Sequence, residues 1–215
     1  MKFFLRITSP FFLVVICTNV LVIAVLFLMN PRTLRGGSQT SCPLPFYGTP
    51  GRFNLLESSG QPLTAESLKG HVWVANFMFT RCQGQCPVMN LKMSALQKSL
   101  SPEARLISFS VDPETDTPAI LSEYARRYSA DPARWLFVTG PKEEMDRAFA
   151  YFHVDQSEDP SMHSLRFVLL DPKANIRGYY DSTDERAVQK MITDARSLLL
   201  ENKTYRIKTS DENKR

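Results

Sequence analysis

Two cysteines with three residues between them, Cys82 and Cys86, are the first candidates for chemistry. A thiolate attacks disulfides and also binds soft metal ions. Dithiol redox catalysts usually have two residues between their cysteines. Three intervening residues form a wider loop, in which both sulfurs can face one Cu(I) ion or, less selectively, one Zn(II) ion. A disulfide that only staples this small loop would remove little unfolded-chain entropy. The spacing leaves a metal site and a redox couple open.

A third ligand would hold such a metal ion more firmly, and the chain has three histidines. His71 lies in a predicted exposed turn before an apolar strand, and His153 lies at the end of a predicted helix. His163 comes directly before the predicted strand 166–170. The fold that the order of strands and helices predicts brings that loop opposite the cysteine loop. His163 is therefore the candidate third ligand.

Other residues near these motifs have simpler interpretations. The methionines Met78, Met89 and Met162 could be auxiliary sulfur ligands, but core packing is the favoured role. Asp112 and Asp116 could steer a partner protein, although turn formation and helix capping explain both.

Alternating strands and helices are predicted to position these residues. Apolar runs predict strands at 53–57, 72–79, 105–111, 135–138, 166–170 and 176–180. Helical patterns are predicted from Pro87 to Leu100, from Thr117 to Tyr128, at 143–152 and, after a capping box at 182–185, to about Leu200. This order predicts an α/β protein with a thioredoxin-like fold and one inserted strand–helix pair. The loop before the first core helix then faces the positive end of that helix, and both cysteines occupy it.

The N-terminal region predicts a membrane anchor. Residues 11–29 carry no charged side chain, and a helix of this length spans about 28 Å. We predict a short flank at 1–10, a transmembrane anchor at 11–29, a Gly/Ser/Thr-rich tether at 30–42, a thioredoxin-like domain with the candidate metal site at 43–201 and a charged flexible tail at 202–215. Cys17 is interpreted as an apolar residue of the anchor. Cys42 is interpreted as a free thiol, with intermolecular disulfide formation or exchange as the alternative.

The composition excludes some classes of function and suggests a compartment. The net charge of +4 is mild, and no Lys/Arg stripe with interleaved aromatics is present, so nucleic acid is not an expected partner. The apolar stretch lacks the small residues of a signal-peptide cleavage site. We expect a bacterial inner-membrane protein with a single span and its soluble domain in the periplasm.

Three motifs in this order resemble the Sco/SenC family of copper delivery proteins: NFMFTRCQGQCP at 76–87, FSVDPETDTP at 109–118 and HSLRFVLLDP at 163–172. The resemblance extends from about Pro43 to Leu200. It implies a thioredoxin fold, a Cu(I) ion held by Cys82, Cys86 and His163, and delivery to the dinuclear copper centre of cytochrome c oxidase. It also implies that the two cysteines can form a disulfide. The family often has a proline and an acidic residue between its cysteines, where this chain has Gln-Gly-Gln.

The expected function is that of a copper metallochaperone. Its expected partners are the copper-centre subunit of the oxidase and a periplasmic copper donor or thiol reductant. The alternative is a thiol-disulfide oxidoreductase that uses Cys82 and Cys86 to reduce the copper-ligand cysteines of the oxidase. A thiol peroxidase of related fold is a third, weaker interpretation.

Overall fold

The computed structural model describes residues 18–20, 43–49, 51–153 and 165–212, with side chains described as far as residue 204. The chain divides into two units, Met1–Cys42 and Pro43–Arg215. In the first unit Thr18–Val20 are helical, and the rest of the expected anchor and tether lies outside the described residues, as do Cys17 and Cys42. No helix within the described ranges combines the length and the apolar character that a membrane crossing requires.

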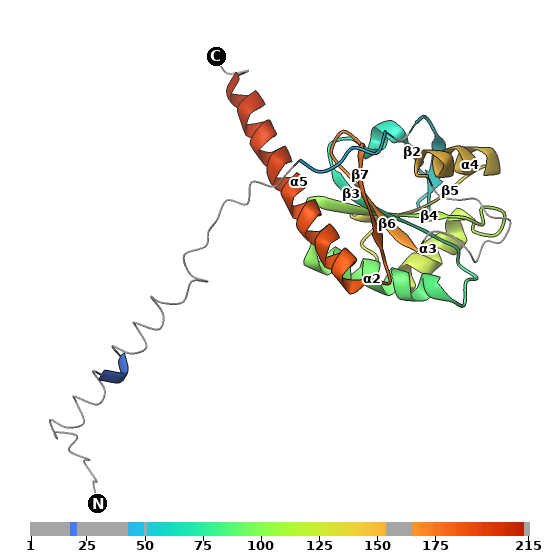
Figure 1. Cartoon of the computed structure of the whole chain (residues 1–215). Helices are drawn as coiled ribbons and strands as arrows, with labels where there is room; N and C mark the ends of the chain where they lie inside the picture. The colour runs from blue at the N-terminus through green and yellow to red at the C-terminus, as the bar shows by residue number, and fades with distance from the viewer. Residues whose placement is uncertain (1–17, 21–42, 50, 154–164, 213–215) are drawn as a thin grey trace, which may run out of the picture. The chain divides into compact units, whose positions relative to one another are not determined.

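The second unit is built on one seven-stranded mixed sheet (Figure 1). Its strands are β1 (Asn54–Glu57), β2 (Pro62–Thr64), β3 (Val72–Met78), β4 (Ala104–Ser110), β5 (Trp135–Thr139), β6 (Arg166–Leu170) and β7 (Ile176–Asp181). They lie in the order β2-β1-β5-β4-β3-β6-β7, with β3, β4 and β5 parallel. All seven residues of β3 are buried, because helices cover both faces of the sheet.

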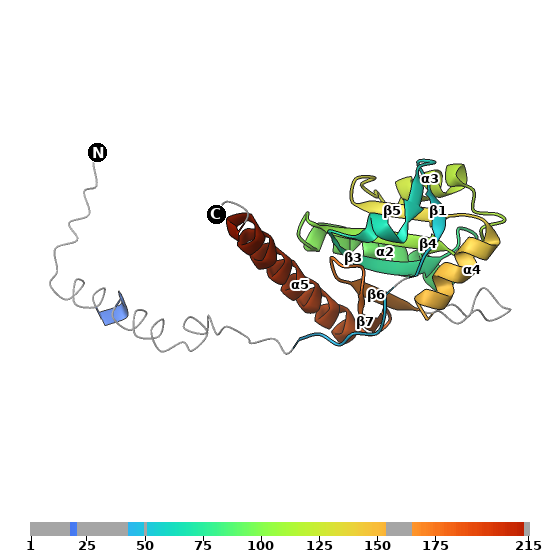
Figure 2. The same cartoon turned by 90° about the horizontal axis from the view of Figure 1, so that it is seen from above.

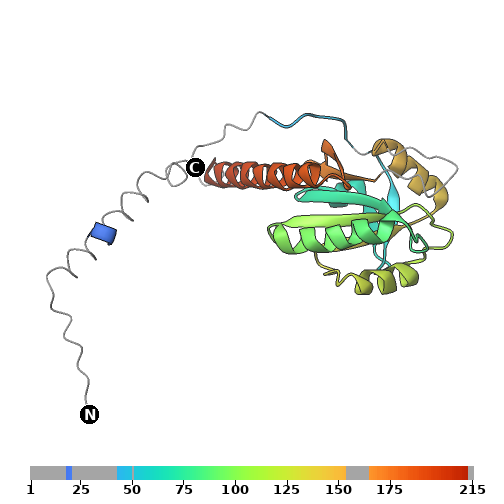
Figure 3. The same ribbon diagram turned by 60° about the horizontal axis from the view of Figure 1, so that its bottom comes forward.

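The helices divide between the two faces. The α-helices are α2 (Gln85–Ser99), α3 (Pro118–Arg127), α4 (Lys142–Tyr151) and α5 (Glu185–Glu212), and Ala65–Leu68 form a short 3-10 helix, η1. α2, α3 and α5 pack on the face that carries Val74, Leu106 and Leu169. α4 and η1 pack on the opposite face, against Phe77 and Phe109. Figures 2 and 3 show these layers from two further directions.

Most predicted elements are present, and the differences have local causes. The predicted core strands and the helix opened by Thr117 and Pro118 are confirmed; the Thr117 side chain accepts a hydrogen bond from the N–H of Ile120. The predicted capping box at 182–185 is wrong, because α5 begins at Glu185 and Asp184 accepts from the N–H of Arg186 instead. The short β2 and η1 were not predicted.

α5 is longer than the sequence pattern suggested. It was expected to end near Leu200, before a flexible tail, but it continues to Glu212. No Gly or Pro follows Leu200, so no strong helix breaker stops the helix there.

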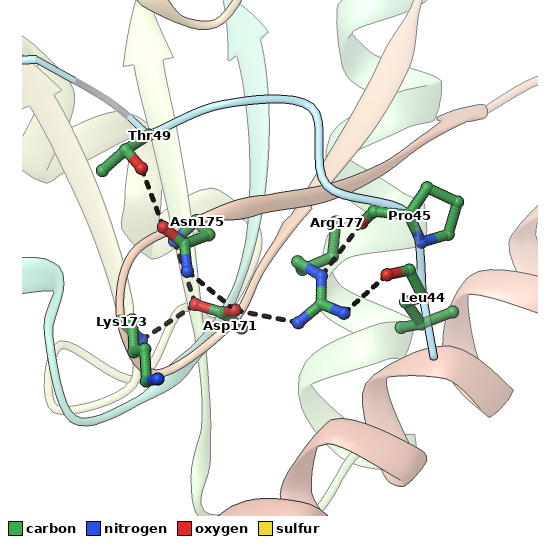
Figure 4. A network of polar contacts seen from close by, with 7 residues as sticks. All are labelled: Leu44, Pro45, Thr49, Asp171, Lys173, Asn175 and Arg177. Atoms are coloured by element: carbon green, nitrogen blue, oxygen red, sulfur yellow. Dashed lines mark hydrogen bonds and ion pairs between the residues drawn. The ribbon is translucent and has the colours of Figure 1, made fainter. Parts of the chain in front are cut away.

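The segment 43–49 is fastened to the start of β7 (Figure 4). The N–H of Tyr47 donates to the Ile176 carbonyl at 2.9 Å, and the N–H of Ile176 donates to the Gly48 carbonyl at 2.8 Å. The Arg177 guanidinium donates to the Pro45 carbonyl at 2.9 Å and to the Leu44 carbonyl at 2.6 Å. Its third contact is an ion pair with Asp171 at 2.9 Å. The described part of the domain is therefore ordered from its first residues.

Candidate metal centre

The two cysteines lie where β3 passes into α2. Cys82 is half-buried in the connecting loop, and Cys86 is 5 % exposed in the first turn of α2. Both are free thiols. The helix was predicted to begin at Pro87 but begins two residues earlier, at Gln85. Pro87 then lies in the first turn of the helix, where a residue without an N–H costs no helical hydrogen bond. Cys86 therefore sits at the positive end of the helix rather than before it.

A buried carboxylate holds the loop in place. Asp116 is fully buried and accepts hydrogen bonds from the N–H of Thr80 at 3.1 Å, from the hydroxyl of Thr80 at 2.5 Å and from the hydroxyl of Ser110 at 2.6 Å. Nearby, Arg81 forms an ion pair with Asp112 at 2.8 Å. The loop that contains Cys82 is thus tied to the loop between β4 and α3.

The roles predicted for the two aspartates are partly wrong. Turn formation holds for Asp112, whose carbonyl accepts from the N–H groups of Thr115 and Asp116. Asp116 is neither a helix cap nor an exposed partner contact, because Thr117 caps α3 and Asp116 is buried against Thr80. A Thr two residues before a cysteine is an inconspicuous signal, so the sequence alone did not reveal this anchor.

A second polar network fixes α2 on the sheet. The Asn76 side chain on β3 donates to the Asn90 side chain at 3.1 Å, and Asn90 donates to the hydroxyl of Tyr124 on α3 at 3.1 Å. The Ser108 hydroxyl donates to Asn76 at 2.6 Å, and the Trp135 indole donates to Ser108 at 2.9 Å. Buried polar groups that satisfy each other's hydrogen bonds favour a single position of the helix on the sheet. Asn90, the member of this network on α2, lies one turn after Cys86.

The electrostatics make the two thiols unequal. Burial works against the Cys82 thiolate, but hydrogen bonds from the Cys86 thiol and from the backbone N–H groups of Cys86, Gly84 and Gln85 together lower the pKa of Cys82 below its ordinary value of 9.0. Burial and the hydrogen bond to Cys82 raise the pKa of Cys86 to about 12. Cys82 is therefore the more nucleophilic thiol, and the mutual effect on the two pKa values marks the thiols as neighbours.

The topology brings the start of β6 to the cysteine end of the sheet. β6 runs antiparallel to β3, with Ala75 opposite Val168, so residues before Arg166 lie toward the end at which β3 leads into the cysteine loop. The Leu165 carbonyl accepts from the N–H of Ser182 at 2.7 Å, which fixes this position. His163, two residues earlier, lies outside the described residues.

The other two histidines belong to other parts of the domain. His71 precedes β3, at the opposite end of the sheet, with its ring centroid 6.2 Å from that of Trp73. His153 follows α4 with a φ of 52°, and its Nδ1 lies 2.8 Å from the Tyr179 hydroxyl. Among the residues that the structure describes, no three His, Cys, Asp or Glu side chains form a complete metal site.

The structure also places two of the three methionines considered as auxiliary ligands, and it contains a pocket away from the thiols. Met78 and Met89 are buried in the core, as predicted, whereas Met162 lies outside the described ranges. A pocket of about 560 Å³ is lined by residues such as Gly70, Arg177 and Leu198, at the end of the sheet away from the cysteine loop. That pocket therefore has no part in the cysteine chemistry.

The comparisons with known proteins agree with this geometry. The SCO1/SenC family model matches residues 46–199. The SCO1 protein homolog of Bacillus subtilis is 34 % identical over 171 residues, which cover 75 % of this chain and 88 % of that protein.

Solved structures show the same fold. A SCO1/SenC family lipoprotein from Bacillus anthracis is 31 % identical with a TM-score of 0.63, over 71 % of this chain and 95 % of that one. BsSco, a member of the Sco family of cytochrome c oxidase assembly proteins in which a disulfide switch was identified, is 31 % identical with a TM-score of 0.62, over 75 % of this chain and 98 % of that one. ScoI of Bradyrhizobium japonicum, solved with copper bound, is 23 % identical with a TM-score of 0.58, over 70 % of this chain and 99 % of that one, and shows the fold alone. The mixed sheet with helices on both faces is thus consistent with the thioredoxin-like fold expected from the sequence.

Proposed function

Because this chain belongs to the SCO1/SenC family, we propose that it is a copper metallochaperone that binds Cu(I) through Cys82, Cys86 and His163. It delivers the ion to the dinuclear copper centre of cytochrome c oxidase during assembly. In this proposal residues 11–29 anchor the chain in the bacterial inner membrane, the domain faces the periplasm, and a periplasmic donor supplies the copper. The description of BsSco as an oxidase assembly protein supports the partner, and the 30 % identity over 139 residues to a putative copper-binding protein of Stutzerimonas stutzeri supports the cargo.

The observation that carries the proposal is the pair of neighbouring free thiols at the start of α2. Cys82 and Cys86 are four positions apart, and each thiol affects the pKa of the other, as expected for groups near enough to share one ion. Two thiolates suit Cu(I), which is soft and accepts low coordination numbers. Half-exposed Cys82 gives a partner access, while buried Cys86 keeps the second sulfur away from solvent.

The position of Leu165 supports His163 as third ligand. Leu165 lies at the cysteine end of the sheet, held by Ser182. Two extended residues span roughly 7 Å, and we propose that His163 uses this length of chain to reach the cysteine loop. An imidazole nitrogen is a good third ligand beside two thiolates.

Copper stoichiometry of the full-length chain tests this proposal. The reduced chain is expected to bind one equivalent of Cu(I), and Cys82→Ser, Cys86→Ser and His163→Ala each to weaken binding by at least tenfold in competition with a chromophoric chelator. His71→Ala is the matched control, because it removes a histidine from the other end of the sheet. Unchanged affinity in the cysteine variants would refute the copper site; unchanged affinity in His163→Ala alone would remove only the third ligand.

Thiol-disulfide exchange is the second candidate, and the unequal thiols favour it. The Cys82 thiolate would attack a substrate disulfide and release one substrate thiolate. Cys86 would then lose its proton and attack Cys82, which releases the second substrate thiolate. The substrate gains two electrons, the chain ends with a Cys82–Cys86 disulfide, and a periplasmic thiol reductant restores it. Full reductase activity in His163→Ala, with a reversible two-electron couple, would support this candidate over the chaperone.

A further inference from the structure

The solvent face of α2 carries apolar side chains beside the cysteines. Val88 is 50 % exposed and Leu91 is 61 % exposed, and Ala95 is exposed one turn further on. Their spacing, i, i+3 and i+7, places all three on one side of the helix. We name Val88, Leu91 and Ala95 the outer stripe.

The outer stripe has no role in the core of the domain. The opposite side of α2 supplies Met89, Met93 and Leu96, which are buried against the sheet. A helix that packs on a sheet with one face normally carries polar residues on the other. α2 follows that rule at its far end, where Lys98 and Ser99 are exposed, and at Lys92, which is half-buried and donates to the Ser182 carbonyl. The large apolar side chains exposed on α2, Val88 and Leu91, lie in its first two turns, the part nearest the thiols.

The surface between Cys82 and the outer stripe is uncharged. Gln83, Gly84 and Gln85 are exposed and carry no charge. The nearest loop cation, Arg81, is paired with Asp112 at 2.8 Å. Gly84, the N-cap of α2, lies four positions before Val88 and therefore on the same side of the helix, and a Cβ built at Gly84 would lie 4.0 Å from the Cys82 Sγ. The outer stripe therefore begins beside Cys82.

We propose that the outer stripe is the docking surface for the copper acceptor, a protein that presents an uncharged, apolar surface next to its own copper-ligand cysteines. This inference rests on the proposed function. During transfer an acceptor thiolate forms a bond to Cu(I) while the bond to Cys82 breaks. Copper stays Cu(I), and the proton lost by the acceptor thiol is balanced by the proton that Cys82 regains. The acceptor surface must therefore lie against the cysteine loop and the first turns of α2.

Apolar contact with the outer stripe gives the complex between this chain and the copper acceptor its affinity. Exposed apolar groups gathered at one place mark interaction surfaces, whereas single exposed apolar residues are common on any protein. A small contact of this kind suits a transient complex, which must release the emptied chaperone after transfer. Because neither surface needs charge, docking should depend little on ionic strength.

The test compares copper transfer by three full-length chains. Val88→Ser/Leu91→Ser removes the apolar groups of the outer stripe, and Leu200→Ser, at a residue 67 % exposed on α5, is the matched control. Each chain is loaded with one Cu(I) and mixed with the copper-free soluble copper domain of the oxidase, and the second-order rate constant of transfer is measured. We expect the rate constant to fall at least tenfold in the double variant, with no change in Leu200→Ser and no change in Cu(I) affinity for either variant.

Several results would overturn the docking surface. An unchanged transfer rate in the double variant would place docking elsewhere, and a loss of Cu(I) affinity would show that the outer stripe acts on the metal site itself. A wild-type transfer rate that falls steeply between low and high salt would assign docking to charged groups. Absence of Cu(I) binding by the wild-type chain is a separate result: it would refute the proposed function and, with it, the acceptor.

Discussion

At the scale of single residues, the chemistry depends on an asymmetry between two thiols. Hydrogen bonds that stabilise the Cys82 thiolate outweigh its partial burial, whereas burial keeps Cys86 protonated. The same asymmetry serves both candidate functions, because an accessible thiolate can begin either metal capture or disulfide attack. The buried thiol then completes the metal site or closes the disulfide.

The asymmetry predicts an order of alkylation. The lowered pKa of Cys82 means that its thiolate fraction rises at a lower pH than in the unfolded chain, so its alkylation rate should level off at a lower pH. Cys86, with a pKa of about 12, stays protonated and unreactive at neutral pH. Iodoacetamide labelling of the reduced, metal-free chain, followed by peptide mass spectrometry, should show Cys82 modified first. Equal labelling of the two sites in the folded chain, as expected in denaturant, would contradict the assignment.

Asp116 is the residue on which the loop geometry depends. Asp116→Ala removes the acceptor for three donors and leaves the half-buried N–H of Thr80 without this partner. Hydrogen bonds to a charged group contribute about 1.5–3 kcal/mol each, and losses are not additive, so we expect the free energy of unfolding to fall by about 2–4 kcal/mol. Chemical denaturation measures this change. Glu114→Ala, an exposed acidic residue of the same loop, is the control and should change stability by less than about 0.5 kcal/mol.

At the scale of elements, long buried runs could be predicted and short or extended pieces could not. The seven buried residues of β3 form an apolar run that only Asn76 interrupts, and the Thr117–Pro118 pair marks the start of α3 by cap chemistry. β2 has three residues and η1 has four, which is too short for a periodic pattern. The start of α5 was misplaced because Ser182 fits a capping pattern, yet Ser182 is buried and its N–H bonds Leu165.

The candidate site shows the same limit. The apolar strand before the cysteines was sufficient to predict that Cys82 lies in the loop after β3, whereas Cys86, expected in the same loop, lies in the first turn of α2. Thr80, Ser110 and Asp116 come from three segments whose meeting depends on the tertiary fold, so no local pattern pointed to them. The apolar exposure of Leu91 was also hidden, since a sequence pattern does not tell which of several apolar residues on a helix face the sheet.

The length of α5 leads to a prediction about truncation. Leu198 and Leu199 are buried, but Leu200 is exposed and no buried apolar side chain follows among the described residues up to Thr204. A stop codon after Lys203 should therefore change the free energy of unfolding by less than about 1 kcal/mol, whereas Leu198→Ala should lower it by about 2–4 kcal/mol. Chemical denaturation of both chains tests this. A loss above about 2 kcal/mol in the truncated chain would show that the last turns of α5 contribute to the core.

At the scale of the whole domain, the thiols and the fastening of the N-terminal segment lie at opposite ends of the sheet. The cysteine loop follows the last residue of β3. Arg177 follows Ile176, which lies opposite Leu170 on β6. Leu170 in turn lies opposite Trp73, near the start of β3. The two ends are therefore separated by the length of β3, about 20 Å. A change at Arg177 should not reach the cysteines.

Arg177→Ala tests this separation. The substitution removes the donors that hold the Leu44 and Pro45 carbonyls, while Asp171 keeps its hydrogen bonds from Lys173 and Asn175. Charge-assisted hydrogen bonds contribute about 1.5–3 kcal/mol each, so opening of segment 43–47 should become at least about tenfold more frequent. Hydrogen exchange at the Tyr47 N–H measures the opening, and Arg127→Ala, which breaks an exposed pair with Glu123, is the control. Cu(I) affinity and the order of cysteine alkylation should stay unchanged in both variants. A shift in either property in Arg177→Ala would show that the two ends of the sheet are coupled, and that the fastening of the N-terminal segment regulates the thiols.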